Sequence, residues 1–157
     1  MNKKLLTTGA LIIIAVVLFA FLPKPNTSIT TKESNRNGEE GIKFFEPNLA
    51  KALQEAKKQN KLVFIDAYTT WCGPCRMLKQ NTFTDKAVGE FFNKNFINIA
   101  LDMEKGEGLA FAAKYQIVAY PTLLIINADQ TSTSVTEGYM EPAQLLEFGK
   151  AVLAQKR

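Results

Sequence analysis

The chain contains 157 residues, a length typical of one domain with an extension. Hydrophobic residues make up 46% of it, which is enough for a folded core and too many for a disordered protein. The net charge of +4 is not gathered into a basic stripe with interleaved aromatic residues, so we do not expect nucleic acid as a partner. There is no histidine, which excludes Cys–His and Ser–His–Asp catalysis and removes the commonest metal ligand.

The N-terminal segment predicts a helix that lies outside the folded domain. Residues 5–22 carry no charge, and a helix of that length measures about 27 Å, close to the roughly 30 Å hydrocarbon thickness of a bilayer. Lys3 and Lys4 precede it and favour a cytoplasmic start, so the rest of the chain would be exported. A cleaved signal peptide would need a small-x-small site, and residues 18–20 begin with a bulky leucine. We expect an uncleaved anchor; a cleaved signal peptide and a buried soluble helix are the alternatives.

Residues 23–41 predict a flexible linker between this segment and the domain. They consist almost entirely of Pro, Asn, Ser, Thr, Gly and charged residues, with Ile29 as the one aliphatic side chain. Such a composition buries too little apolar surface to offset the entropy of ordering the chain. The predicted organisation is therefore a membrane anchor or signal segment over 1–22, a linker over 23–41 and a folded domain over 42–157.

The folded domain is predicted to begin with a helix, a strand and a second helix. Apolar residues recur at helical spacing over residues 47–60. The continuous apolar run over residues 62–68 is typical of a strand covered on both faces. The next helix is predicted to begin near Cys72 and to continue to Gln80.

The remaining predicted elements complete an α/β fold. In chain order they are a helix over 86–93 capped by Thr84 or Asp85, a strand over 96–101, a helix ending near Tyr115, strands over 121–126 and 135–139 joined by a turn, and a helix from Glu141 onward. Because helices connect the first strands, we expect those strands to be parallel, with an antiparallel edge added by the final hairpin. The prediction is a mixed sheet of about four strands between two helix layers.

The two cysteines of the chain, Cys72 and Cys75, allow three uses. A structural zinc site usually needs four Cys or His ligands, which this chain does not have, so no metal is expected. An inert structural disulfide would close only a very small loop and would add little stability. Thiol–disulfide exchange fits the placement best, because the pair follows a strand and opens a helix.

An exchange site would divide the work between the two thiols. The N-terminus of a helix stabilises a thiolate at Cys72, which is then the attacking group, and Cys75 resolves the mixed disulfide. Cys75 lies one turn into the helix and is expected to be the less exposed of the two. Pro74 fits the first helical turn, Gly73 leaves the thiol uncovered, and Trp71 offers an apolar surface to a partner protein.

Three motifs together resemble the thioredoxin superfamily. They are the sequence WCGPC over residues 71–75, Asp66 six residues before Cys72, and Ala-Tyr-Pro-Thr over residues 119–122. The resemblance implies a thioredoxin-like fold over residues 42–157. It also implies that Asp66 exchanges protons with Cys75, that Pro121 follows a cis peptide bond, and that the backbone of Tyr120 pairs with a bound substrate strand.

The chain departs from cytosolic thioredoxin at two points. Gln80 stands where thioredoxin has a proline, and residues 96–101 lack the lysine that lies near the aspartate of thioredoxin, so we expect that charge to be missing. Residues 75–88 instead resemble the C-terminal periplasmic domain of the membrane thiol:disulfide reductases of the cytochrome c biogenesis type. Within that segment, Phe83 is expected to pack in the core.

The predicted function is an exported thiol:disulfide oxidoreductase, tethered to the inner membrane of a bacterium and facing the periplasm. The Gly-Pro pair between the cysteines, with no histidine, favours a reductant. Its expected partners are disulfide-containing exported proteins and a membrane electron donor of the thiol-reductase type; no cofactor is expected, and the protein is expected to be a monomer. The alternative is a binding or chaperone-like module of thioredoxin fold in which the thiols are secondary.

Overall fold

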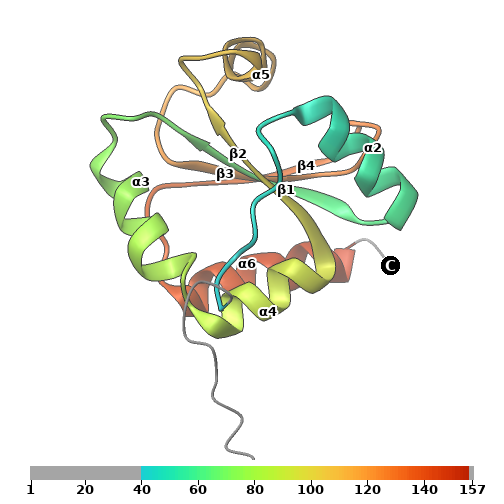
Figure 1. Cartoon of the computed structure of the whole chain (residues 1–157), viewed down its shortest axis with the longest axis vertical. Helices are drawn as coiled ribbons and strands as arrows, with labels where there is room; N and C mark the ends of the chain where they lie inside the picture. The colour runs from blue at the N-terminus through green and yellow to red at the C-terminus, as the bar shows by residue number, and fades with distance from the viewer. Residues whose placement is uncertain (1–39, 156–157) are drawn as a thin grey trace, which may run out of the picture. The chain divides into compact units, whose positions relative to one another are not determined.

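The computed structural model describes residues 40–155, which form a mixed sheet with helices on both faces (Figure 1). The predicted anchor over residues 5–22 lies outside this range, as does the linker up to residue 39. Within residues 40–155, no helix has the length and apolar character needed to span a bilayer.

The sheet has four strands in the order β2-β1-β3-β4. The strands are β1 (Leu62–Tyr68), β2 (Phe96–Asp102), β3 (Thr122–Ile126) and β4 (Thr133–Glu137). β1 is an inner strand, as its continuous apolar run predicts, because both of its faces are buried. It pairs in parallel with β2, which places Asp66 beside Ala100, and antiparallel with β3, which places Asp66 beside Leu123.

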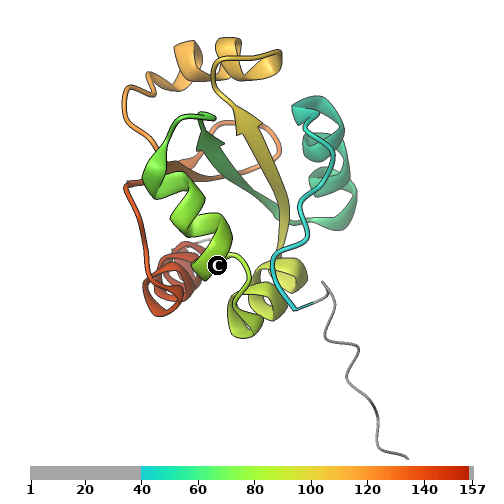
Figure 2. The same cartoon turned by 60° about the vertical axis from the view of Figure 1, so that its left-hand side comes forward.

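The direction of β3 corrects the prediction that all helix-connected strands are parallel. β3 is antiparallel to β1, although α5 (Glu107–Tyr115) precedes it. Nine helical residues measure about 14 Å, too short to return along a seven-residue strand of about 23 Å. α5 therefore stays at the end of the sheet where β2 ends (Figures 1 and 2), and Thr122 re-enters beside Ala67.

The final hairpin is confirmed, although its second strand begins earlier than predicted. β4 starts at Thr133 rather than at residue 135 and pairs antiparallel with β3. Asn127 closes the turn, because its side-chain oxygen accepts hydrogen bonds from the backbone N–H groups of Thr131 and Ser132 at 2.9 and 3.1 Å. Because this turn ends at Ser132, Thr133 can pair with Ile126 directly after it.

Helices cover both faces of the sheet, as predicted. One face carries α2 (Leu49–Gln59) and α5, and the other carries α3 (Gly73–Met77), the π-helical segment η1 (Leu78–Thr82), α4 (Lys86–Asn95) and α6 (Pro142–Gln155). α4 and α6 run side by side beneath the sheet in both views (Figures 1 and 2). α4 begins where predicted, because the side chain of Asp85 accepts a hydrogen bond from the backbone N–H of Val88 at 2.9 Å.

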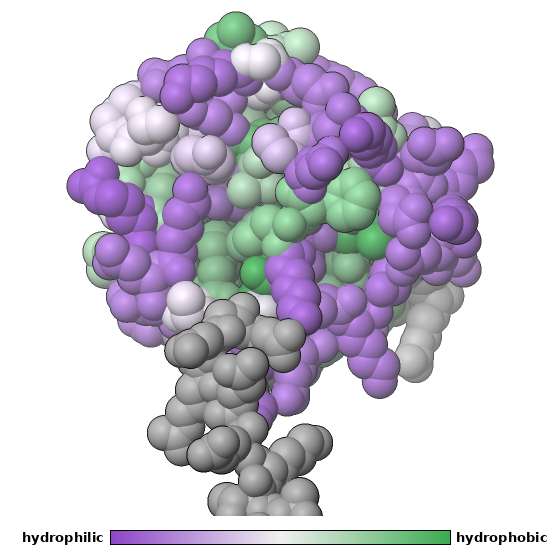
Figure 3. Space-filling model, in the orientation of Figure 1, coloured by the Kyte–Doolittle hydropathy of each residue, from purple (hydrophilic) through white to green (hydrophobic). Residues whose placement is uncertain are grey.

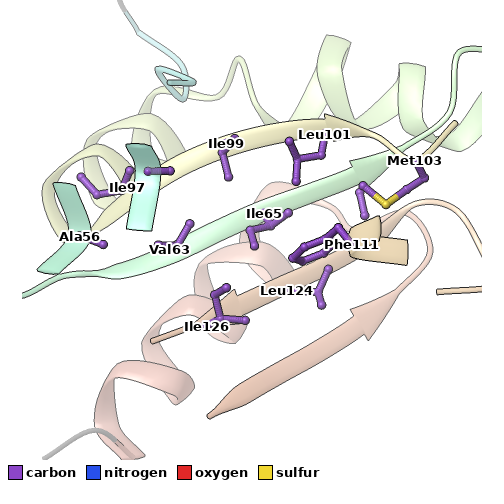
Figure 4. Packing of buried hydrophobic residues seen from close by; sticks show 12 residues of the cluster. Ala56, Val63, Ile65, Ile97, Ile99, Leu101, Met103, Phe111, Leu124 and Ile126 are labelled. Carbon is purple, nitrogen blue, oxygen red and sulfur yellow. The ribbon is translucent and has the colours of Figure 1, made fainter. Parts of the chain in front are cut away.

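Strand alternation divides the buried side chains into two cores. On the α2 and α5 face, Val63 and Ile65 of β1 pack against side chains of β2 and β3, with Ala56 and Phe111 covering them (Figure 4). The next residues along β1, Phe64 and Asp66, point to the opposite face, because successive strand side chains alternate.

The opposite core is rich in aromatic side chains. Phe64 packs edge-to-face on Phe92 of α4, with ring centroids 4.7 Å apart. Phe83 is 4% exposed and its ring lies 5.3 Å from that of Phe44, so the prediction that it packs in the core is confirmed. This core lies beneath the helix that carries the cysteines, and Asp66 lies on its face of the sheet.

The helix after the cysteines is not the single α-helix that was predicted. α3 ends at Met77, and a π-helical turn continues to Thr82. Gln80, which replaces the proline of thioredoxin, lies inside this turn. The turn is closed by a hydrogen bond from the backbone N–H of Phe83 to the carbonyl oxygen of Leu78 at 2.8 Å. Single π-helical turns are rare and frequently mark functional sites.

Candidate active site

Cys72 and Cys75 are joined in a disulfide, with an S–S distance of 1.98 Å, at the point where β1 leads into α3. Cys72 is the N-cap of α3, and its Sγ accepts a hydrogen bond from the backbone N–H of Cys75 at 3.1 Å. Pro74 lies in the first turn of the helix, as predicted, where its missing N–H removes no helical hydrogen bond. The sequence thus places the pair where the structure has it.

Cys75 was predicted to be the less exposed cysteine, but in this oxidised state both cysteines are buried and differ by only one percentage point. Cys72 is 3% exposed and Cys75 is 2% exposed. The reason is the cap geometry: Cys72 turns its sulfur back onto the first turn of the helix, toward the amide of Cys75. The two sulfurs differ instead in their hydrogen bonding, because Cys72 Sγ is the one that receives the backbone N–H.

Asp66 is completely buried in the middle of the sheet. Neither carboxylate oxygen has a hydrogen-bond partner within residues 40–155. Burial raises the pKa of Asp66 from 3.8 to about 7, and the positive charge of Lys79 acts in the opposite direction. A carboxyl group with a pKa near neutrality can both accept and release a proton at physiological pH, which suits acid–base chemistry.

Lys79 is a residue that the sequence reasoning missed. β2 has no lysine, as noted above, but the expectation that Asp66 therefore lacks a neighbouring positive charge is wrong, because Lys79 of η1 lowers its pKa. The Lys79 ammonium lies 3.5 Å from the centroid of the Tyr68 ring, at the end of β1. The sequence held one signal for Lys79: it follows Cys75 by four residues, and residues four apart lie on the same face of a helix.

An aromatic pair, the exposed Trp71 and the half-buried Tyr120, includes the residue directly before Cys72. Trp71 is 63% exposed, and its ring lies edge-to-face with that of Tyr120, with centroids 5.9 Å apart. The peptide bond between Tyr120 and Pro121 is cis, as the resemblance implies. The indole Nε1 of Trp71 donates a hydrogen bond to Glu104 at 3.0 Å. Glu104, in the turn after β2, is a second residue that sequence reasoning missed, and no local pattern points to it.

Within residues 40–155, no group of three or more Cys, His, Asp or Glu side chains is placed so that it could hold a metal ion. The structure instead brings the predicted site residues to one end of the sheet: the disulfide at the start of α3, Trp71 before it, and Tyr120 and Pro121 before β3.

Comparison with known proteins shows which protein family the chain belongs to. A thioredoxin-like family model matches residues 45–128, so the chain belongs to the thioredoxin-like family. The solution structure of a candidate disulphide-isomerase from Bacteroides thetaiotaomicron is 40% identical, covers 72% of this chain and 96% of its own, and superposes with a TM-score of 0.63. The oxidised C-terminal domain of DsbD from Neisseria meningitidis shares the fold, at 21% identity over 70% of this chain and 97% of its own, with a TM-score of 0.57.

The similar proteins include thiol:disulfide interchange proteins and a thioredoxin-like protein. DsbD of Tatumella citrea is 24% identical over 143 residues, which are 88% of this chain and 25% of that protein. A thioredoxin-like protein of Synechocystis is 33% identical over 87 residues, which are 55% of this chain and 77% of that protein. The chain spans only about a quarter of the length of DsbD. These relatives and the Cys72–Cys75 disulfide support thiol:disulfide oxidoreductase activity.

Proposed function

We propose that this protein is an exported protein-disulfide reductase, held at the periplasmic side of a bacterial inner membrane by residues 5–22 and able to turn on the linker over residues 23–41. The observation that carries the proposal is the Cys72–Cys75 disulfide at the start of α3, together with the buried, unpartnered carboxyl group of Asp66 on the same side of the sheet. A thiol pair supplies the electrons, and a carboxyl group with a pKa of about 7 supplies a proton acceptor.

The reaction begins from the reduced pair. The Cys72 thiolate attacks one sulfur of a client disulfide, forms a mixed disulfide and releases the other client sulfur as a thiolate. Cys75 then loses its proton to the Asp66 carboxylate and attacks the Cys72 sulfur. The Cys72–Cys75 disulfide forms, and the second client sulfur leaves and takes up a proton. One disulfide is reduced and one is formed, with two electrons transferred.

The direction proposed is reduction. Gly73 and Pro74 are the pair found between the cysteines of the reducing members that the sequence resembles, and no histidine is available between the cysteines. Electrons would come from a membrane thiol reductase, because the periplasm holds no thiol buffer of its own. The similarity to the interchange protein DsbD supports a donor of that class.

Clients would dock on the surface around Trp71 and Tyr120. Trp71 directly precedes Cys72 and is exposed, and the ring of Tyr120 packs against it. An extended client segment could pair with the backbone of Tyr120 before the cis bond to Pro121, which would hold its disulfide near Cys72.

Two cysteine variants test the proposal. Cys72→Ala should abolish reduction of insulin disulfides, and Cys75→Ser should accumulate mixed disulfides with clients in the cell. The equilibrium potential of the pair should lie near −270 mV, on the order of that of thioredoxin, whereas a value near −120 mV would mark an oxidant. If a chain without cysteines restored the phenotype of a deletion strain, the binding-module alternative would replace the reductase.

A further inference from the structure

A groove of about 580 Å³ lies on the same side of the sheet as Asp66. The groove is lined by Ile42 and Phe44, which precede α2, by Lys79 and Phe83, which follow the cysteines, and by Ala100 of β2. In Figure 1 the chain that leads into α2 crosses the face toward the viewer. Figure 3, in the same orientation, shows hydrophobic surface in the middle of that face, with hydrophilic residues around it. The groove is therefore largely apolar, with Lys79 and Glu40 as the charged residues that line it.

Ala100 connects this groove to Asp66. The two residues are partners in the parallel pairing of β1 with β2, so their side chains point to the same face from strands about 4.8 Å apart. Ala100 lines the groove, whereas the carboxyl group of Asp66 is completely buried beside it on β1. Ala100 is thus the groove residue that is paired in register with Asp66.

Lys79 lies on this side of the sheet, against the ring of Tyr68. Its backbone lies in the π-helical turn over Leu78–Thr82, and its ammonium lies 3.5 Å from the centroid of the Tyr68 ring. Tyr68 lies two residues after Asp66 on β1, so both side chains are on the same face. The positive charge of Lys79 is therefore positioned on the side of the sheet toward which Asp66 points.

Other charged groups around Asp66 are occupied elsewhere. Asp102, at the end of β2, pairs with Lys105 at 3.1 Å, and the charge of Lys79 also helps to lower the pKa of Asp102. Glu40, at the groove margin, lies 4.0 Å from Lys86. The β3 partner of Asp66 is Leu123, and the buried residues of α6 do not titrate. Apart from Tyr68, which is neutral near pH 7, and the two cysteines, Lys79 is the ionisable group within residues 40–155 whose charge acts on Asp66.

We propose that Lys79 is a positioning residue for proton transfer, which acts from the groove to keep Asp66 in the ionised form that accepts the proton of Cys75. The proposal rests on the proposed reductase function for its role in turnover. The electrostatic part, Lys79 acting on Asp66, does not depend on that function and can be tested without any client.

The first experiment titrates Asp66 directly in the oxidised full-length chain. The carboxyl ¹³C resonance of Asp66 reports its ionisation, and no electron transfer is needed. Lys79→Gln should move the midpoint of the Asp66 titration upward by about 1 pH unit. A nearby opposite charge shifts a pKa by about 1–3 units, and we expect the lower value because Lys79 is exposed and solvent screens its charge. Lys79→Arg should restore the wild-type midpoint. An unchanged midpoint in Lys79→Gln would overturn the proposal.

The second experiment relocates the charge. Ala100→Lys, added to Lys79→Gln, places an ammonium on β2 in register with Asp66 and should bring the midpoint back down. Lys150→Gln is the matched control, because Lys150 is also exposed on a helix and also lies over an aromatic ring, 6.0 Å from that of Phe91. A shift of the Asp66 midpoint in the control as large as in Lys79→Gln would show a general charge effect and refute the specific role.

The third experiment joins the titration to turnover. Lys79→Gln should slow resolution of the Cys72 mixed disulfide about fivefold at pH 7, and its pH profile should shift upward with the Asp66 midpoint. In an Asp66→Asn background, Lys79→Gln should have no further effect. A loss of activity that persisted in this background would show that Lys79 acts on the client or the cysteines instead. Inactivity of the wild type toward disulfides would refute the reductase while leaving the titration result intact.

Discussion

The buried carboxyl group of Asp66 makes a quantitative prediction about stability. Its pKa is about 7 in the folded protein and 3.8 when exposed, so between these values the folded state binds a proton that the unfolded state releases. The contribution of this group to the free energy of unfolding is therefore fully present below about pH 4 and is lost as the pH rises to about 7. A shift of about 3 pKa units corresponds to about 4 kcal/mol, with a slope of at most about 1.4 kcal/mol per pH unit.

Asp66→Asn should remove this dependence, because the amide does not ionise. The measurement is guanidinium unfolding of the oxidised full-length chain at intervals from pH 4 to pH 8. The wild type should lose about 4 kcal/mol relative to Asp66→Asn across that range. A constant offset is expected as well, since the buried amide also lacks partners, at a cost of about 1–3 kcal/mol. The comparison therefore uses the change with pH and not the absolute stability.

A matched control separates this effect from general titration. Asp129→Asn removes a carboxylate whose side chain is 70% exposed and which lies 3.7 Å from Lys57. It should leave the pH dependence of the wild type unchanged, because an exposed ion pair contributes little. If the wild type and Asp66→Asn kept parallel stability curves from pH 4 to pH 8, the assignment of a raised pKa to Asp66 would be refuted.

Two further predictions concern the surroundings of the site. Glu104→Ala removes the hydrogen bond to the Trp71 indole and should raise the KM for a protein disulfide about two- to threefold with little change in kcat, whereas Glu147→Ala, on the exposed face of α6, should not. An equal loss in kcat would contradict a role in holding Trp71 for docking. Phe92→Ala, in the completely buried aromatic core, should lower the free energy of unfolding by about 3–5 kcal/mol, and Val118→Ala, at an 88% exposed position, should change it by less than about 0.5 kcal/mol. A small loss for Phe92→Ala would show that the core can close around the missing ring.

Most elements of the fold could be predicted from local patterns. The apolar run before Asp66 defines β1 as an inner strand, and Asp85 defines the start of α4, because periodicity and capping are properties of neighbouring residues. The position of Cys72 at the start of a helix is local in the same sense. These features needed no knowledge of which segments meet in space.

The direction of β3 could not be predicted in this way. The helix before it suggested a parallel crossover, but direction depends on whether that helix runs the length of the sheet, and α5 is too short to do so. The π-helical turn that carries Lys79 also had no local signal, since Gln80 fits an ordinary α-helix equally well. The turn also contacts a segment that is distant in the sequence, because Thr82 Oγ1 donates a hydrogen bond to the carbonyl oxygen of Met140 at 2.6 Å.

The sequence alone was enough to propose the candidate site residues, because a thiol pair, an aspartate on an apolar strand and a proline before the next strand can be read in order along the chain. The tertiary structure decided their electrostatics. Strand pairing leaves Asp66 buried without a partner and beside Ala100, and the packing of η1 on Tyr68 brings the charge of Lys79 to the same side. Burial and charge proximity depend on contacts between residues far apart in sequence, and only the folded chain defines those contacts.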